Sequence, residues 1–164
     1  MATKDVVPPN KPPFALLTMT EGYRAFAEYL SLPATKRFIG STPAGDGKPV
    51  LVLPGLMAGD ATTRPLRRIL AERGYTPYGW GLGANVGPTP RLLAGLDAAL
   101  GRIADEHGEP VSLVGWSLGG LLARDLVVRH PDSVDRLIAL GSPFGITSDR
   151  QSRAALIYNL CARF

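Results

Sequence analysis

The feature that most constrains the fold of this chain is the pentapeptide GWSLG, which occupies Gly115 to Gly119. The residues before it, 111–116, are apolar and rich in β-formers, as in a central strand of a parallel sheet that is covered on both faces. The residues after it, 118–129, carry apolar side chains at intervals of three and four, which predicts a helix. The sequence therefore predicts a buried strand, a tight turn that carries Ser117, and a helix.

Glycine on both sides of Ser117 has a mechanical reason. A nucleophilic serine on a sharp strand-to-helix turn is strained, and side chains at Gly115 and Gly119 would collide with the adjoining strand and helix. The following helix directs its free N–H groups and positive dipole end at Ser117, which favours the oxyanion of acyl transfer. The alternative is a serine in an ordinary strand-to-helix loop of a doubly wound fold, because the pentapeptide also occurs by chance.

The segment SLVGWSLGGLLAR, residues 112–124, resembles the nucleophile elbow of the α/β-hydrolase superfamily, in particular of its lipase and esterase branch. The resemblance implies that Ser117 is the nucleophile and that the backbone N–H of Leu118 is one oxyanion donor. Many members have His or Tyr in place of Trp116, a position that bears on the wall of the acyl pocket. We therefore expect the Trp116 side chain to contact substrate.

A second segment, LVLPGLMAGD at residues 51–60, resembles the oxyanion loop of lipases, with Pro54 in place of the usual His. By position, the resemblance implies that the N–H of Leu56 is the other oxyanion donor, with Met57 as the fallback donor and a substrate contact. One such donor is typically worth a factor of about 10² to 10³ in turnover. The alternative is a plain turn in which the glycines only permit the bend.

A third segment, RLIALGSPFG at residues 136–145, resembles the lipase strand that ends in Gly-Ser-Pro beside the active site. The glycine-rich loop 81–88 has neither the spacing of a dinucleotide-binding loop nor the Lys-Ser/Thr of a Walker loop, so no cofactor is predicted. Asn85 in this loop either touches substrate or holds the loop through side-chain hydrogen bonds, and the sequence leaves both open.

Strands are predicted at residues 50–53, 75–80, 111–116 and 134–140, with helices at 63–73, about 90–107 and 118–129. The strands at 50–53, 111–116 and 134–140 are expected to be buried. We expect Asp60 or Thr62 to cap the first of these helices. Alternation of strand and helix predicts the α/β class: a partial α/β-hydrolase fold, with a parallel sheet, right-handed βαβ crossovers and helices on both faces.

The 164 residues suffice for one domain. We expect a disordered, proline-rich leader at 1–13, a helical segment at 14–40 with a helix over 14–30, and the hydrolase core at 41–164 with a last helix over 151–164. The net charge of +4 is scattered, which argues against a nucleic-acid partner. A single cysteine, Cys161, builds neither an internal disulfide nor a thiolate metal site. We expect no metal, no stable membrane span and a cytoplasmic location; the oligomeric state is open.

A serine nucleophile needs a base, and in this superfamily the chain order is Ser, then Asp or Glu, then His. The sequence has two histidines, His107 and His130. His130 ends the helix that begins at the nucleophile, and His107 precedes the central strand, so neither is assigned as the base. We expect the base and acid beyond residue 164, in a longer esterase of which this is the front part. A non-catalytic hydrolase-like binding protein, or a second chain that supplies both groups, are the alternatives.

The expected substrate is a small-molecule or lipid-like carboxylic ester with an apolar acyl part, because the loops are lipase-like and Leu56, Met57 and Trp116 are apolar. Thioesters, amides and acyl transfer to another alcohol share this chemistry. The sequence does not separate them.

Overall fold

The computed structural model describes residues 44–142. The expected leader at 1–13, the helical segment at 14–40 and the helix at 151–164 lie outside the described residues, and the division of the chain at these points stays a prediction. In chain order the elements are β1 (Pro49–Leu53), α2 (Asp60–Glu72), β2 (Thr76–Gly79), α3 (Pro90–His107), β3 (Val111–Trp116), α4 (Leu118–Arg129), a single 3₁₀ turn (Pro131–Ser133) and β4 (Val134–Leu140).

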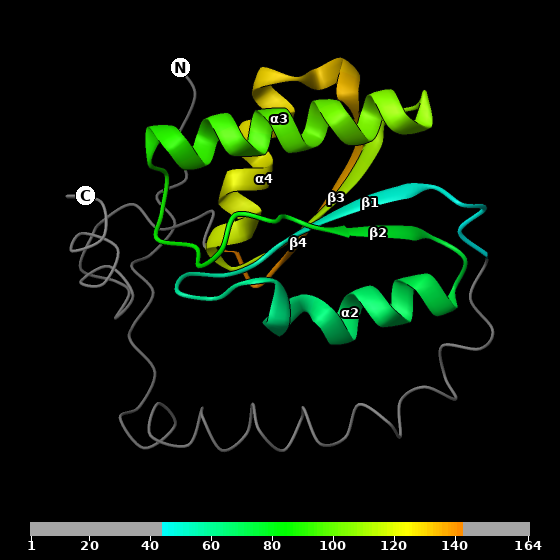
Figure 1. Cartoon of the computed structure of the whole chain (residues 1–164), viewed down its shortest axis with the longest axis horizontal. Helices are drawn as coiled ribbons and strands as arrows, with labels where there is room; N and C mark the ends of the chain where they lie inside the picture. Colours follow the sequence, from blue (N-terminus) through cyan, green and yellow to red (C-terminus); the bar gives the residue numbers. More distant parts are fainter. Residues whose placement is uncertain (1–43, 143–164) are drawn as a thin grey trace, which may run out of the picture. The chain divides into compact units, whose positions relative to one another are not determined.

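The four strands form one parallel sheet in the order β2-β1-β3-β4. Helix α2 lies on one side of the sheet, and α3 and α4 lie on the other (Figure 1). The chain moves one way from β1 to β2 and the opposite way from β2 to β3, and the helices change sides with it, as crossovers of one hand require. This arrangement confirms the predicted partial α/β-hydrolase fold.

The two central strands, β1 and β3, are packed on both faces, as their apolar sequences predict. Leu51 and Leu113 point to the α3 and α4 side, where they join a core built on Leu96, Leu100 and Leu126. Side chains of the opposite parity, Val50, Val52 and Val114, pack against Leu66 and Leu70 of α2. Because side chains alternate along a strand, one short apolar run supplies both layers of the core.

Helix α3 is predicted correctly at both ends. The Thr89 hydroxyl accepts a hydrogen bond from the Leu92 N–H at 3.2 Å, which caps the first turn. Gly108 ends the helix with a φ of +65°, a conformation that glycine adopts without strain.

The predicted cap of α2 is wrong. The helix begins at Asp60, three residues before the expected start, and Gly59 occupies the cap position without a side-chain hydrogen bond. The Asp60 carboxylate instead accepts the N–H groups of Trp80 and Gly81, each at 3.0 Å. Thr62 donates its hydroxyl to the Gly59 carbonyl at 2.7 Å. Asp60 therefore ties the start of α2 to the end of β2.

The prediction that β4 is buried is also wrong. Its residues are half-buried or exposed, and Ile138 and Leu140 are 49% and 42% exposed. Within residues 44–142, β4 pairs with β3 alone and stands at the edge of the sheet. Asp135 is the extra residue where the register with β3 shifts, a bulge at the start of the strand. An apolar edge strand has the composition of a central one, so composition alone did not distinguish them.

None of the helices in the described part of the chain combines the length and the apolar character needed to cross a membrane.

Candidate active site

The loops that follow β1 and β3 meet at the carboxyl edge of the sheet. These strands are neighbours, yet the chain leaves β1 toward α2 on one face and leaves β3 toward α4 on the other. Such a point, where the direction of strand order reverses, opens a crevice that binds ligands in doubly wound folds. Ser117 and the loop 54–59 lie there, so the topology itself brings the two predicted landmarks together.

Ser117 has a backbone conformation that few residues with a side chain adopt. Its φ is +52° and its ψ is −117°, at the junction of β3 and α4. Its N–H donates to the Leu140 carbonyl of β4 at 2.8 Å, and its carbonyl accepts the Gly120 N–H at 3.1 Å. The strained residue is thus fixed from β4 on one side and from the first turn of α4 on the other. Sequence reasoning missed the contribution of Leu140, which uses a main-chain atom and leaves no signal in the sequence.

The glycines around Ser117 make room for backbone. A Cβ atom on Gly115 would fall on Gly120 of the helix, and a Cβ atom on Gly119 would fall on the Leu53 carbonyl oxygen of β1. A Cβ atom on Gly120 would overlap the buried hydroxyl of Ser142. Helix α4 therefore starts in close contact with the ends of β1 and β3, with its first N–H groups beside the serine.

The β1–α2 loop passes directly beside Ser117. A Cβ atom on Gly55 would lie 3.5 Å from the Ser117 Cβ. Ala58 donates its N–H to the Gly55 carbonyl at 3.1 Å, which closes a tight turn, and Met57 within this turn has a φ of +58°. The N–H of Met57 donates to the Asn85 carbonyl at 2.8 Å. Within residues 44–142 no acceptor is found for the N–H of Leu56 or of Leu118.

Asn85 is fully buried between this loop and the loop 81–88. Its Nδ2 donates to the Pro54 carbonyl at 2.8 Å, and its Oδ1 accepts the Gly87 N–H at 3.1 Å. Of the two roles that the sequence left open for Asn85, the structure shows the loop-holding one.

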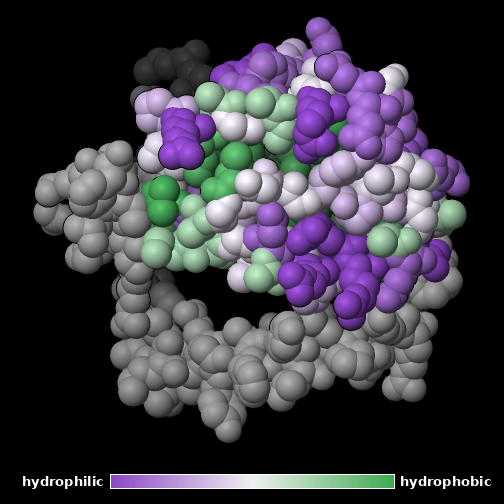
Figure 2. All heavy atoms as spheres, in the orientation of Figure 1, coloured by the Kyte–Doolittle hydropathy of each residue, from purple (hydrophilic) through white to green (hydrophobic). Residues whose placement is uncertain are grey.

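Large apolar side chains stand exposed at this edge. Trp116, the last residue of β3, is 50% exposed, and Met57 is 57% exposed. Figure 2 shows hydrophobic residues gathered on this view mostly toward the carboxyl ends of the strands, between α3 and α2. An apolar surface beside a strained serine suits a substrate with an apolar part.

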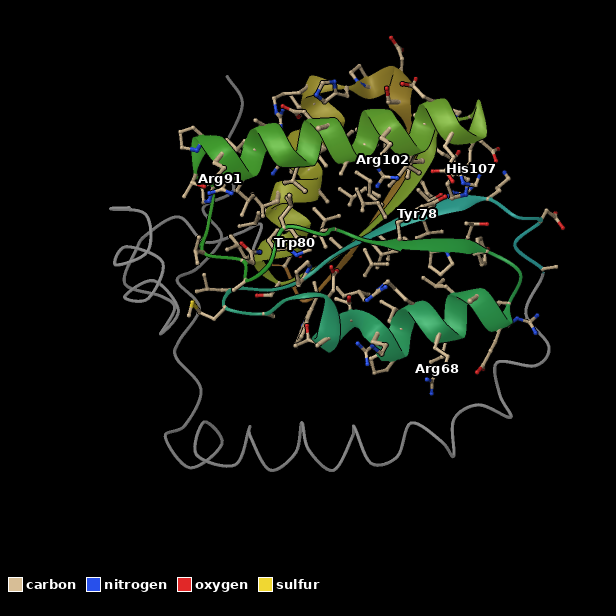
Figure 3. The ribbon with its side chains drawn as sticks, in the orientation of Figure 1. Arg68, Tyr78, Trp80, Arg91, Arg102 and His107 are labelled. Carbon is tan, nitrogen blue, oxygen red and sulfur yellow. The ribbon has the colours of Figure 1, made fainter. Side chains whose placement is uncertain are left out.

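Both histidines lie away from Ser117. His107 Nε2 is 2.7 Å from the Tyr78 hydroxyl, and Figure 3 shows this pair at the opposite end of α3 from Arg91, which stands near its start. His130 follows the last residue of α4, and 12 helical residues rise about 18 Å. Its Nε2 is 2.9 Å from Asp97 Oδ1 on α3.

Asp97 joins His130 and Arg129 to the middle of α3. Partial burial works against the charged form of Asp97, but hydrogen bonds from Arg129 and His130 outweigh it and hold the pKa of Asp97 below its usual value. Arg129 also pairs with Asp125 at 2.9 Å. These groups satisfy one another in an ion-pair network. In the described residues no group of three or more His, Cys, Asp or Glu side chains is placed to hold a metal ion.

No protein-family model matches the chain. A pimeloyl-[acyl-carrier protein] methyl ester esterase of Aromatoleum aromaticum is 35% identical over 108 residues, which cover 52% of this chain and 43% of that protein. A putative carbamate hydrolase of Yersinia enterocolitica is 38% identical over 69 residues, 42% of this chain and 25% of that protein. A solved structure of an alpha/beta hydrolase enzyme from the metagenome of lagoon sediments at Mar Chica, Morocco, has 26% identity and a TM-score of 0.48, covering 71% of this chain and 57% of that one.

The matched region spans less than half the length of these curated relatives. Both relatives are nevertheless named as hydrolases. Their similarity agrees with the parallel sheet, whose strand order reverses between β1 and β3, and with the turn that carries Ser117 after β3. The chain is a member of the α/β-hydrolase superfamily.

Proposed function

We propose that this chain carries the nucleophile and the oxyanion hole of a serine hydrolase that acts on carboxylic esters. The observation that supports the proposal most is the backbone of Ser117, with a φ of +52° at the junction of β3 and α4. Strained conformations of this kind persist where the surrounding structure holds them, and they cluster at active sites. An ordinary loop serine has no need of this strain.

In the proposed reaction, Ser117 Oγ attacks the ester carbonyl carbon while its proton passes to a general base. The carbonyl oxygen becomes an oxyanion, which accepts hydrogen bonds from the N–H groups of Leu56 and Leu118. Collapse of the intermediate breaks the ester C–O bond, and the leaving alkoxide takes the proton from the base. Water then attacks the acyl-enzyme in the same way and frees Ser117.

The general base of this proposal is neither His107 nor His130. Both side chains are engaged with partners at the amino edge of the sheet, and the sequence contains no third histidine. We place the base and its acid in sequence beyond residue 164, which agrees with the superfamily order of nucleophile, acid and histidine.

The proposed substrates are small-molecule or lipid-like esters with an apolar acyl part. The exposed side chains of Trp116 and Met57 beside Ser117 support an apolar contact. One similar protein is named for a methyl ester and another for a carbamate, and both are cleaved at a carbonyl carbon.

The proposal is tested by reaction of the 164-residue chain with a fluorophosphonate, followed by intact mass and peptide mapping. We expect one label on Ser117 and none in Ser117→Ala. Imidazole added as an external base should accelerate the reaction, because it replaces the group that the proposal places elsewhere. Label on other residues only, or none on a folded chain at high imidazole, would refute the assignment.

A further inference from the structure

We propose that Asn85 positions the oxyanion loop, so that the N–H of Leu56 and not that of Met57 faces the reacting carbonyl. The inference rests on the proposed function of Ser117 and adds to it a residue that acts through the loop without touching substrate. The observation that supports the inference is that one buried residue, Asn85, holds the loop on both sides of Leu56 through its side chain and its main chain.

Asn85 makes four hydrogen bonds, and three of them reach the β1–α2 loop. Its Nδ2 donates to the Pro54 carbonyl at 2.8 Å, and its main-chain N–H donates to the Ala58 carbonyl at 2.8 Å. Its main-chain carbonyl accepts the Met57 N–H at 2.8 Å. The fourth bond, from the Gly87 N–H to Oδ1 at 3.1 Å, fixes the Asn85 side chain itself in a local turn.

These bonds decide which amide of the loop is available. The Met57 N–H is used by Asn85, whereas for the Leu56 N–H no acceptor is found within residues 44–142. Asn85 therefore selects the donor.

The position demands an amide. One group must donate to the Pro54 carbonyl and another must accept from Gly87, within a site from which water is excluded because Asn85 is fully buried. Aspartate has the acceptor without the donor, and alanine has neither. A buried carbonyl that loses its donor is costly, so the loop is expected to shift when Asn85 is replaced.

The test compares Asn85→Ala with Ser112→Ala in the full 164-residue chain. Ser112 is also buried and donates a side-chain hydrogen bond, to Asp135 at 3.3 Å, but it lies at the amino half of β3 and outside the proposed site. Each variant is treated with a p-nitrophenyl alkylphosphonate and with its P=S analogue, in the presence of imidazole. The rate constant for label on Ser117 is measured for each reagent.

The ratio of the two rates reports the oxyanion hole, because N–H donors stabilise a charged oxygen better than a charged sulfur. We expect Asn85→Ala to lower the P=O rate about tenfold to a hundredfold and to reduce the P=O to P=S ratio. Ser112→Ala should keep the wild-type P=O rate and the wild-type P=O to P=S ratio. If Asn85→Ala kept the wild-type ratio and rate, the positioning role would be overturned.

Amide hydrogen exchange tests the loop without relying on Ser117 reactivity. In the wild type the Met57 amide should exchange slowly and the Leu56 amide quickly; Asn85→Ala should abolish the difference. Equal exchange patterns in the two proteins would overturn the inference even if Ser117 reacts, whereas failure of wild-type Ser117 to react would count against the proposed function alone.

Asn85→Asp serves if the alanine variant fails to fold. In its ionised form this carboxylate faces the Pro54 carbonyl without a donor and the loop should be displaced, whereas the protonated carboxyl regains a donor; because burial raises the pKa of such a carboxyl, the pH series extends into the alkaline range. We expect its labelling rate, relative to wild type at each pH, to recover as the pH falls. A relative rate that stays at the wild-type level throughout would contradict the role of the Nδ2 donor.

Discussion

The two edges of the sheet use their residues in opposite ways. At the amino edge, titratable side chains satisfy one another: Tyr78 bonds both His107 and Glu106, and Asp97 binds His130 and Arg129. At the carboxyl edge, the groups that we propose to act on substrate, apart from the Ser117 hydroxyl, are main-chain atoms of the loops 54–59 and 117–120. The charged and polar side chains named at the amino edge are paired with one another, whereas at the carboxyl edge the N–H groups of Leu56 and Leu118 have no acceptor within the described part of the chain.

Backbone strain follows the same division. Three residues other than glycine have a positive φ in the described part of the chain: Asp46, Met57 and Ser117. Asp46 precedes β1 in an Asp-Gly turn, and aspartate tolerates this conformation. Met57 and Ser117 have no such tolerance, and both lie at the carboxyl edge. Backbone strain that the side chain does not offset is therefore found at the edge where we propose the active site.

The largest effect is expected from an added methyl group at the carboxyl edge. Gly119→Ala would drive a Cβ atom into the Leu53 carbonyl oxygen, where both partners are backbone, and should destabilise the protein by about 3 kcal/mol or more. The matched change Gly101→Ala in α3 meets open space and should stabilise by about 0.5–1 kcal/mol. Urea unfolding of both variants measures the difference, and equal stabilities would break the contrast between the edges.

Relief of strain gives the next effect. Met57→Gly should stabilise the fold by about 1 kcal/mol, because glycine adopts a positive φ freely. Asp46→Gly should stabilise the fold by only about a few tenths of a kcal/mol, because aspartate already tolerates a positive φ. The entropy cost of a new glycine is common to both, so the difference between their melting temperatures isolates the strain. A larger rise in melting temperature for Asp46→Gly than for Met57→Gly would contradict the inference that the greater strain lies at Met57.

A smaller, pH-dependent effect belongs to the amino edge. Asp97 has a lowered pKa, so its ion pairs contribute fully above the unfolded-state pKa of about 4 and are lost as the pH falls through the lower folded-state value. Because the Asp97 side chain is 36% exposed, Asp97→Asn should cost less than about 1 kcal/mol at pH 7. The gap in unfolding free energy between wild type and variant should narrow below pH 4; a gap that widens in acid would contradict the sign.

No effect on Ser117 is expected from the histidines. His107→Gln and His130→Gln should each keep the fluorophosphonate labelling rate within about twofold of wild type, because both side chains belong to the amino edge. A tenfold loss of the labelling rate in either variant would identify that histidine as the base, and would contradict the separation of the two edges.

The sequence predicted the features that local chemistry decides. The apolar run of β3, the glycine pair around Ser117 and the extent of α3, predicted at about 90–107, all depend on residues close together in the chain. The roles of Asp60 and Asn85 depend on partners 20 and 31 positions away, Trp80 and Pro54, and a single sequence does not say that these meet. The sequence therefore predicts Asp60 as a cap of its own helix, whereas its carboxylate binds the end of β2.

Strand β4 shows the other limit. Its seven residues are apolar enough for a central strand, but burial depends on what lies beyond each face, and that information is not in the strand itself. The positions of Ile138 and Leu140 illustrate this, since they alternate with Leu137 and Ala139, which face the helices.

The exposed edge of β4 also bears on self-association of the protein at high concentration. The Asp135 bulge and the Arg136 charge discourage intermolecular pairing along the first half of β4, whereas along the second half, within residues 44–142, apolar side chains and one main-chain edge have no neighbouring strand. We expect the 164-residue chain to self-associate through residues 137–140 at high concentration. Ile138→Lys should reduce this association, because a charged side chain opposes edge-to-edge pairing.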